Sequence, residues 1–128
     1  MWEIRVRTTK RVEAVNITRE VEGAVKGKDG RLMHLFTPHT TCGLLVNEDA
    51  DPNVIRDIME ALERISPIDY PYKHTEGNAH AHIRSSLIGA SLMIPFSAGR
   101  PLLGTWQGIF LMEFDGPRER RVVITLLD

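Results

Sequence analysis

The stretch from Ser91 to Leu127, SLMIPFSAGRPLLGTWQGIFLMEFDGPRERRVVITLL, decides the fold class. Its three apolar runs predict strands over residues 91–96, 103–114 and 121–127. Turn-forming residues separate the runs, Ser97-Ala98-Gly99 after the first and Asp115-Gly116-Pro117 after the second. A run of three strands closing a chain is typical of an α+β fold and not of a regular βαβ array.

Helices and further strands precede this stretch. Residues 2–8 alternate apolar and polar, which predicts a half-buried strand. Asp51 and Pro52 form a strong helix start before an apolar stripe that Pro67 ends. The remaining expected elements are a helix over 17–27 with Asn16 as N-cap, strands over 31–37 and 42–47, a loop over 66–79, and a short helix from Asn78 to Ala90. We therefore expect an α+β single domain over residues 1–128, with about three helices and a largely antiparallel, mixed β-sheet.

Composition narrows the classes of function. A chain of 128 residues with 42% apolar residues has room for one domain and enough apolar side chains for a core. The net charge of −1 gives no electrostatic reason to expect nucleic acid or an acidic membrane as partner. Cys42 is the single cysteine, charges interrupt the N-terminal segment, and no apolar run approaches the ~18 residues that span a bilayer. These features predict a cytoplasmic protein.

Histidines are the residues most suggestive of chemistry. Three of the five, His74, His80 and His82, fall within nine residues. Neutral imidazole is the commonest metal ligand, and three nitrogen donors plus water form an open catalytic zinc site. The alternative is a set of surface or interface histidines, because this spacing is not a familiar signature. His34, which alternates with apolar neighbours, is expected in the core or an interface.

The local structure decides which histidines could share an ion. In a helix His80 and His82 sit ~200° apart, because each residue turns ~100°. If a helix begins at Asn78, only one of the two joins His74. A third ligand must then come from elsewhere, and His39 in its polar turn is the best remote candidate.

An acidic segment and a glycine-bracketed segment form two further groups. Asp51 is explained as an N-cap and Asp49 partly by the helix dipole, which leaves Glu48 as a candidate general base. In the predicted strand over 103–114, Gly104 and Gly108 bracket Trp106, which indicates either a bulge with Trp106 in the core or close approach of a ligand. Cys42 is interpreted as a small core residue, with a nucleophilic pair with His39 as the alternative.

Three motifs together resemble those of the YjbQ-like family. The first is HTTCGL from His39, followed by NEDADP from Asn47, and the second is HTEGNAHAHI from His74. The third is GR at Gly99, LGTWQGI from Leu103 and EF at Glu113. Their order and spacing are similar to the family's over essentially the whole chain. The position of His80 departs from the pattern, in which it is more often Asp or another residue.

The resemblance implies a compact homotrimer that carries the label secondary thiamine-phosphate synthase. That reaction joins an aminopyrimidine diphosphate to a thiazole phosphate and releases pyrophosphate. With the helix argument, it favours a divalent metal, zinc or magnesium, on His39, His74 and His82. Glu48 is the expected general base. The residues expected to contact a small phosphorylated substrate are Asn47, Arg84, Ser85, Arg100, Trp106 and Gln107.

Two functions remain open from the sequence. The first is an enzyme in which the metal stabilises charge on a phosphate or activates water, with Arg84 or Arg100 holding the phosphate. The second is a trimeric module that binds a metal or small ligand without turnover. The lack of a Gly-rich phosphate loop counts against efficient diphosphate chemistry.

Overall fold

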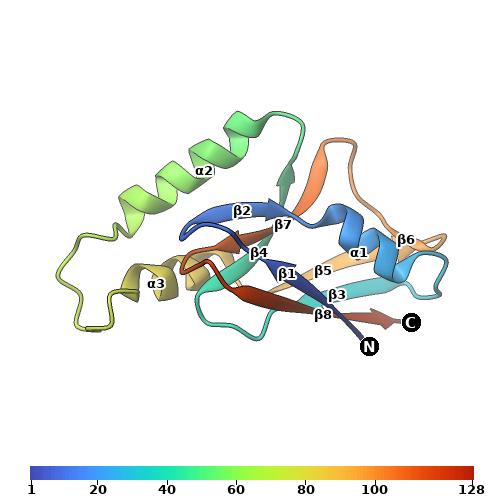
Figure 1. Cartoon of the computed structure of the whole chain (residues 1–128). Helices are drawn as coiled ribbons and strands as arrows, with labels where there is room; N and C mark the ends of the chain where they lie inside the picture. Colours follow the sequence, from blue (N-terminus) through green and yellow to red (C-terminus); the bar gives the residue numbers. More distant parts are fainter.

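A computed structural model describes residues 1–128 as eight strands and three helices (Figure 1). In chain order, the elements are β1 (Trp2–Arg7), β2 (Glu13–Asn16), α1 (Thr18–Val25), β3 (Leu32–Phe36), β4 (Cys42–Glu48), α2 (Pro52–Ile65), α3 (Ala79–Ile88), β5 (Ser91–Ser97), β6 (Arg100–Pro101), β7 (Gln107–Glu113) and β8 (Glu119–Leu127). The prediction of an α+β fold with three helices is confirmed.

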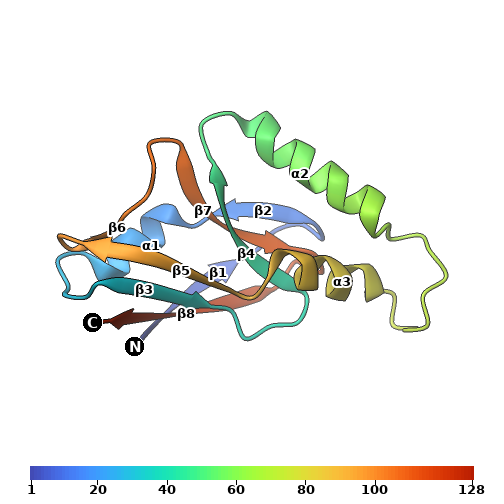
Figure 2. The ribbon, with the colours of Figure 1, turned by 180° about the vertical axis from the view of Figure 1, so that it is seen from behind.

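The strands form two antiparallel sheets. One has the order β1-β8-β3-β5-β6 and the other β2-β7-β4. Paired strands are antiparallel throughout, with β1 on β8, β3 between β8 and β5, and β7 between β2 and β4. Seen from both sides, α2 and α3 lie beyond the smaller sheet, and α1 lies toward the β6 end (Figures 1 and 2).

Strand β7 separates two apolar cores. Ile109 and Leu111 belong to the main core, which also takes residues from α1 and from strands of both sheets. Phe110 and Met112 point the other way, into a smaller core with Leu62 of α2. Residues buried on both faces explain why β7 reads as a continuous apolar run in the sequence.

The helices begin close to the predicted residues. The Asp51 carboxylate accepts a hydrogen bond from the Asn53 N–H at 2.9 Å, so the predicted cap of α2 is present. Asn16 lies one residue before the N-cap of α1, and its side chain accepts from the Thr18 N–H at 3.0 Å. Asn78 occupies the N-cap position of α3 without a capping side-chain bond. None of the helices is both long and apolar enough to cross a bilayer.

The strand predicted over 103–114 is wrong in its first part, and β2 was not predicted. Gly104 and Trp106 lie outside β7, in a turn before Gln107. The Gln107 side chain accepts from the Gly104 N–H at 2.8 Å, which closes this turn in place of a strand ladder. Trp106 is 63% exposed, so a core position under a bulge is also wrong.

Helix α3 packs tightly on β4, and this contact positions the candidate site. The Ser85 hydroxyl donates to the Cys42 carbonyl at 2.7 Å, and the Leu44 N–H donates to the Gly89 carbonyl at 3.0 Å. A Cβ atom at Gly43 would lie 2.8 Å from that Gly89 oxygen. Glycine at position 43 therefore allows the close approach of helix and strand.

Candidate functional site

A polar cavity of about 380 Å³ lies where the β3–β4 connection, the start of α3 and the β7–β8 connection meet. Apart from Pro38, every residue that lines it is polar or charged. The lining residues are Pro38, His39, Thr40, Thr41, Glu76, Asn78, His82, Asp115, Arg118 and Arg120. We refer to it as the histidine cavity, because His39 and His82 contribute to its wall.

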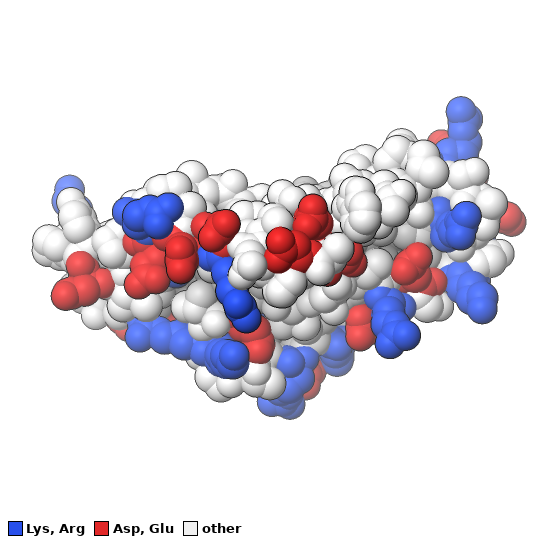
Figure 3. Space-filling model, turned by 90° about the horizontal axis from the view of Figure 1, so that it is seen from above, with Lys and Arg blue, Asp and Glu red and all other residues white.

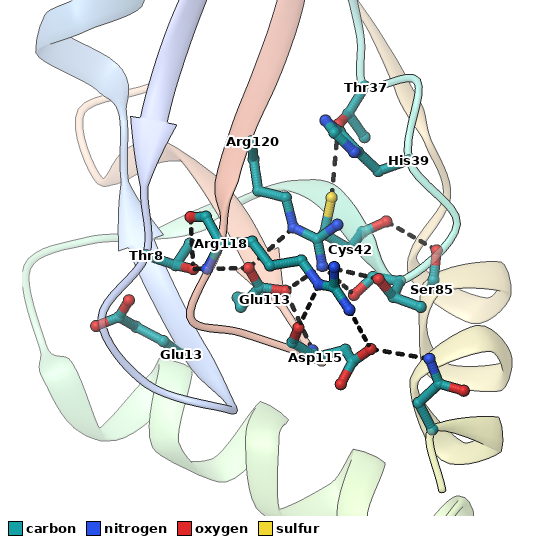
Figure 4. Close-up of polar contacts among 12 residues, drawn as sticks. Thr8, Glu13, Thr37, His39, Cys42, Ser85, Glu113, Asp115, Arg118 and Arg120 are labelled. Carbon is teal, nitrogen blue, oxygen red and sulfur yellow. Dashed lines mark hydrogen bonds and ion pairs between the residues drawn. The ribbon is translucent and has the colours of Figure 1, made fainter. Parts of the chain in front are cut away.

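Arg120 of the cavity lining forms a buried ion pair with Glu113, which does not itself line the cavity (Figure 4). Glu113 accepts from both Nε and Nη2 of Arg120, and from the Thr8 hydroxyl at 2.7 Å. The Arg120 Nη2 also donates to the Thr41 hydroxyl at 2.8 Å. Side-chain exposure is 0% for Glu113 and 3% for Arg120. The network ties together β7, β8, the residue after β1 and the residue before β4.

The Glu113 carboxylate is held in its ionised form. Burial raises the pKa of Glu113, but hydrogen bonds from Arg120, Thr8 and the Asp115 backbone lower it by more, so the net shift is downward. For Arg120, burial is the largest single influence and lowers the pKa, but the bond to Glu113 and the nearby negative charges together raise it by more, so the net shift is upward. Because the charges of Arg120 and Glu113 cancel, the pair offers no free charge to a ligand.

Asp115 joins the cavity to the start of α3. It accepts from the Asn78 side-chain NH₂ at 2.8 Å and from Arg118 Nη2 at 3.1 Å. Burial raises the pKa of Asp115, yet these two donors lower it by more. The Asn78 amide oxygen is buried without a hydrogen-bond partner. This free acceptor, in a residue that lines the cavity, suits a ligand that donates a hydrogen bond or carries a cation.

His39 is a neutral imidazole in this arrangement. Its Nε2 accepts from the Arg121 backbone N–H at 3.1 Å, which assigns the proton of the neutral ring to Nδ1. Burial lowers the pKa of His39, and the positive charges of Arg120 and Arg121 lower it further. The nitrogen that binds the backbone is not free to bind a metal.

His74 and His82 form a close pair next to the cavity. Their ring centroids are 5.2 Å apart in an edge-to-face arrangement, and both line an adjoining pocket. The His74 Nε2 lies 3.9 Å from the Glu76 carboxylate. His80 points the opposite way into the protein and is 0% exposed, as expected for two residues separated by ~200° in a helix.

The donor atoms fit a shared metal ion only in part. Two imidazoles 5.2 Å apart are close enough to approach one ion after small rotations, because each nitrogen must come within ~2.0–2.1 Å of zinc. His39 lies on the cavity wall with His82, but its Nε2 is occupied. No three histidine, cysteine, aspartate or glutamate side chains are placed to hold an ion. The three-histidine site stays a prediction that requires His39 to release Arg121.

The other predicted site residues do not line the histidine cavity. Arg84 and Ser85 are 2% and 7% exposed, and they bond to the Ser66 and Cys42 carbonyls. Glu48 pairs with Gln107 at the far end of β4, about 20 Å from Cys42 at ~3.3 Å per residue. Its carboxylate accepts from the Asp51 N–H at 3.2 Å, a structural role that sequence reasoning did not find. Asn47 and Trp106 lie at the same end of β4, and Arg100 lies in β6.

Comparison with known proteins identifies the family. The family model described as "UPF0047 protein YjbQ-like" matches residues 2–128. The chain belongs to the YjbQ-like family. Among its members, the UPF0047 protein MJ1081 of Methanocaldococcus jannaschii is 45% identical, with 99% of this chain and 94% of that protein covered. YugU of Bacillus subtilis is 42% identical, with 97% and 96% covered.

Solved YjbQ-like structures have the same fold. A crystal structure of a family member from Clostridium acetobutylicum is 43% identical, with a TM-score of 0.93 over 99% of this chain and 100% of that one. The conserved hypothetical protein TT1486 from Thermus thermophilus is 47% identical, also with a TM-score of 0.93 and the same coverage. Structural similarity at this level indicates that these proteins share the two-sheet fold described above.

Sequence reasoning missed the ion pair of this YjbQ-like chain. The signal was present, because Glu113 alternates with Leu111 and Ile109 on the core-facing side of β7. Arg120 alternates in the same way with Val122 in β8. A charged residue at an apolar position of each of two strands predicts a buried pair, since neither charge is stable there alone.

Proposed function

We propose that this protein binds a small phosphorylated molecule in the histidine cavity together with a divalent metal. The observation that carries the proposal is the cavity itself, whose lining is polar apart from Pro38 and includes two histidines. Thr40 and Asn78 supply neutral hydrogen-bonding groups. A site of this composition suits a polar ligand better than an apolar one.

The charge balance favours a metal as part of the site. Arg118 is paired with Asp115 and Arg120 with Glu113, so neither arginine brings a free positive charge to a phosphate. A divalent ion held by His74 and His82, with His39 joining, would supply that charge and stabilise it on the phosphate. Zinc and magnesium are the candidates, and imidazole ligands favour zinc.

For the reaction, we propose a weak thiamine-phosphate synthase activity, in which an aminopyrimidine diphosphate and a thiazole phosphate are joined. Glu48 is too far along β4 to act on a ligand in the histidine cavity of its own chain. It would act there only from a neighbouring subunit. The same end of the strand also holds Asn47, Trp106 and Gln107. A neighbouring subunit that contributes Glu48 would contribute these residues too.

The accompanying proposal is a homotrimer. The outer face of the five-stranded sheet supports it, because four large apolar side chains there are at least 38% exposed. They are Leu32, Phe36, Met93 and Leu127. Neighbouring apolar residues on an open sheet face are a common feature of subunit interfaces.

A non-catalytic binding protein is the second candidate. Asp115 lines the cavity and Glu113 pairs with the cavity residue Arg120, and both carboxylates have lowered pKa values. A general acid or base works best with a pKa near the operating pH, so neither is suited to proton transfer near neutrality. Binding of a metal and ligand without turnover needs no such group.

Metal analysis and a turnover assay test these proposals. We expect the purified protein to bind zinc with one site per chain, and inorganic phosphate to bind more tightly when zinc is present. Pyrophosphate release from the two thiamine precursors, lost in the His82→Ala variant, would support the synthase. Metal and phosphate binding without release would support the binding protein, and the absence of both would contradict the whole proposal.

A further inference from the structure

A second cavity lies between α2 and the sheet that contains β2 and β7, at the opposite end of β4 from the histidines. Its volume is about 650 Å³, within the range of ~300–1,000 Å³ for small-molecule sites. Five apolar side chains form its floor: Val12, Ala14, Ile55, Met59 and Phe110. We refer to it as the α2 groove. A solvated acidic surface would have no such floor.

The rim of the α2 groove is acidic. Five carboxylates line it, and they are Glu13, Glu48, Asp49, Asp51 and Glu60. Lys10 and Arg56 are the basic residues of the lining. Figure 3, which looks onto the α2 side of the molecule, shows acidic side chains gathered there. A low-dielectric floor beneath charges of one sign strengthens their attraction for a ligand of the opposite sign.

The N-terminus of α2 does not offset the negative charge of the rim. Helix N-termini attract anions through their free N–H groups, but here the Asp51 carboxylate accepts the Asn53 N–H. Asp49 also lines the groove, and its side chain packs against Gly108, where a Cβ atom would lie 2.6 Å from its carboxylate oxygen. Gly108 therefore provides the space that Asp49 occupies.

The apolar stripe of α2 is only partly covered by the protein. Of the fourteen residues of the helix, only Leu62 is buried. Ile55 and Met59 are half-buried and line the groove. These side chains offer apolar contact area to a ligand, and Phe110, which is 5% exposed, contributes to the bottom of the groove.

From the floor and the rim together we infer that the α2 groove binds a small organic cation with an apolar or aromatic body. The apolar part would lie on Phe110 and Met59, and the positive group would face the carboxylates. This site goes beyond the proposed function and does not depend on metal or phosphate binding in the histidine cavity. Four rim carboxylates remain, Glu13, Asp49, Asp51 and Glu60, when Glu48 contacts the cavity of a neighbouring subunit.

Three aromatic probes of similar size test the charge preference: the benzylammonium ion, benzyl alcohol and benzoate. The five methionine methyl groups give separate reporters in ¹³C NMR of the full-length protein. Met59 lines the groove, whereas Met93 lies on the larger sheet outside the groove and serves as the control. We expect benzylammonium to shift the Met59 signal saturably, with a Kd on the order of millimolar for a ligand of this size. Benzyl alcohol should bind more weakly, and benzoate should not bind.

Two matched double variants separate the rim from general surface charge. Asp49→Asn with Glu60→Gln removes two rim charges without changing shape, and should weaken benzylammonium about tenfold. Asp57→Asn with Glu63→Gln removes two charges from α2 outside the groove and should leave the Kd within twofold. The Kd of benzyl alcohol should be the same in both double variants as in the wild type.

Three outcomes would overturn the inference. The first is equal binding of benzoate and benzylammonium, and the second is equal weakening by the two double variants. The third is a Met59 signal that responds to none of the probes, as expected if a second copy of the chain fills the groove. A protein that fails to bind zinc or phosphate but passes these tests would contradict only the proposed function.

Discussion

Replacing Glu113 with alanine should destabilise the protein severely, because it leaves a charged group buried without a partner. Arg120 is 3% exposed and has Glu113 as its ionic partner. Breaking a buried pair from one side costs about 3–5 kcal/mol. A domain of this size has a total unfolding free energy of about 5–15 kcal/mol. The expected fall in Tm is roughly 10–25 °C for a chain of this length.

Urea unfolding followed by circular dichroism at pH 7 measures the loss. The double variant Glu113→Leu with Arg120→Met replaces both charges with apolar groups and should regain at least half of it. Glu119→Ala is the control, since Glu119 pairs with Arg5 and Arg7 on the exposed side of the sheet. The control should change the unfolding midpoint very little. A loss below about 1 kcal/mol for Glu113→Ala would refute the argument, because the pair would then contribute no more than an average substitution.

The same pair should affect stability at acid pH. The pKa of Glu113 is lower in the folded than in the unfolded chain, so its ionised form favours folding. That contribution is fully present above the unfolded pKa of about 4.3 and is lost as the pH falls through the lower folded value. The difference in stability between wild type and Glu113→Gln should therefore shrink below about pH 4. A difference that stays constant from pH 7 to pH 3 would contradict the assigned direction.

Three further predictions concern the site and the assembly. In zinc titration calorimetry, His82→Ala should abolish binding. His80→Ala removes an inward-facing ring and should weaken zinc binding at most ~10–100-fold. The reverse result would place His80 on the metal. Gly43→Ala should destabilise the contact of α3 with β4, because its Cβ would meet the Gly89 carbonyl at 2.8 Å, and thermal unfolding would show a lower Tm. Light scattering at micromolar concentration should report a trimer, and a monomer would refute the assembly proposal.

Local sequence signals predicted most of the elements. The Asp51-Pro52 start, the alternation of β1 and the apolar run of β7 each reflect an interaction within a few residues or a uniform burial pattern. The turn at Gly104 was missed because a side chain three residues away closes it. Strand β2 was missed because its half-buried residues show no clear period, and pairing with β7 stabilises it.

The site was predicted less completely because a sequence motif does not specify how far apart its residues lie in space. A helix from Asn78 correctly separates the buried His80 from His82, since the angle between them follows from helix geometry alone. The motif that joins His39 to Glu48, by contrast, runs along an extended strand. Cys42 and Glu48, at the two ends of that strand, are consequently about 20 Å apart, at ~3.3 Å per residue.

Residues close in sequence on a strand are thus held apart, and β4 brings each of its ends to a different cavity. The histidine cavity combines imidazoles with two neutralised ion pairs, whereas the α2 groove combines an apolar floor with an excess of carboxylates over basic side chains. A phosphorylated ligand is favoured at the first only with a metal, and a cation is favoured at the second without one. This electrostatic difference between the two cavities, more than the shared motif, is the basis on which we propose two separate sites whose ligands differ in charge.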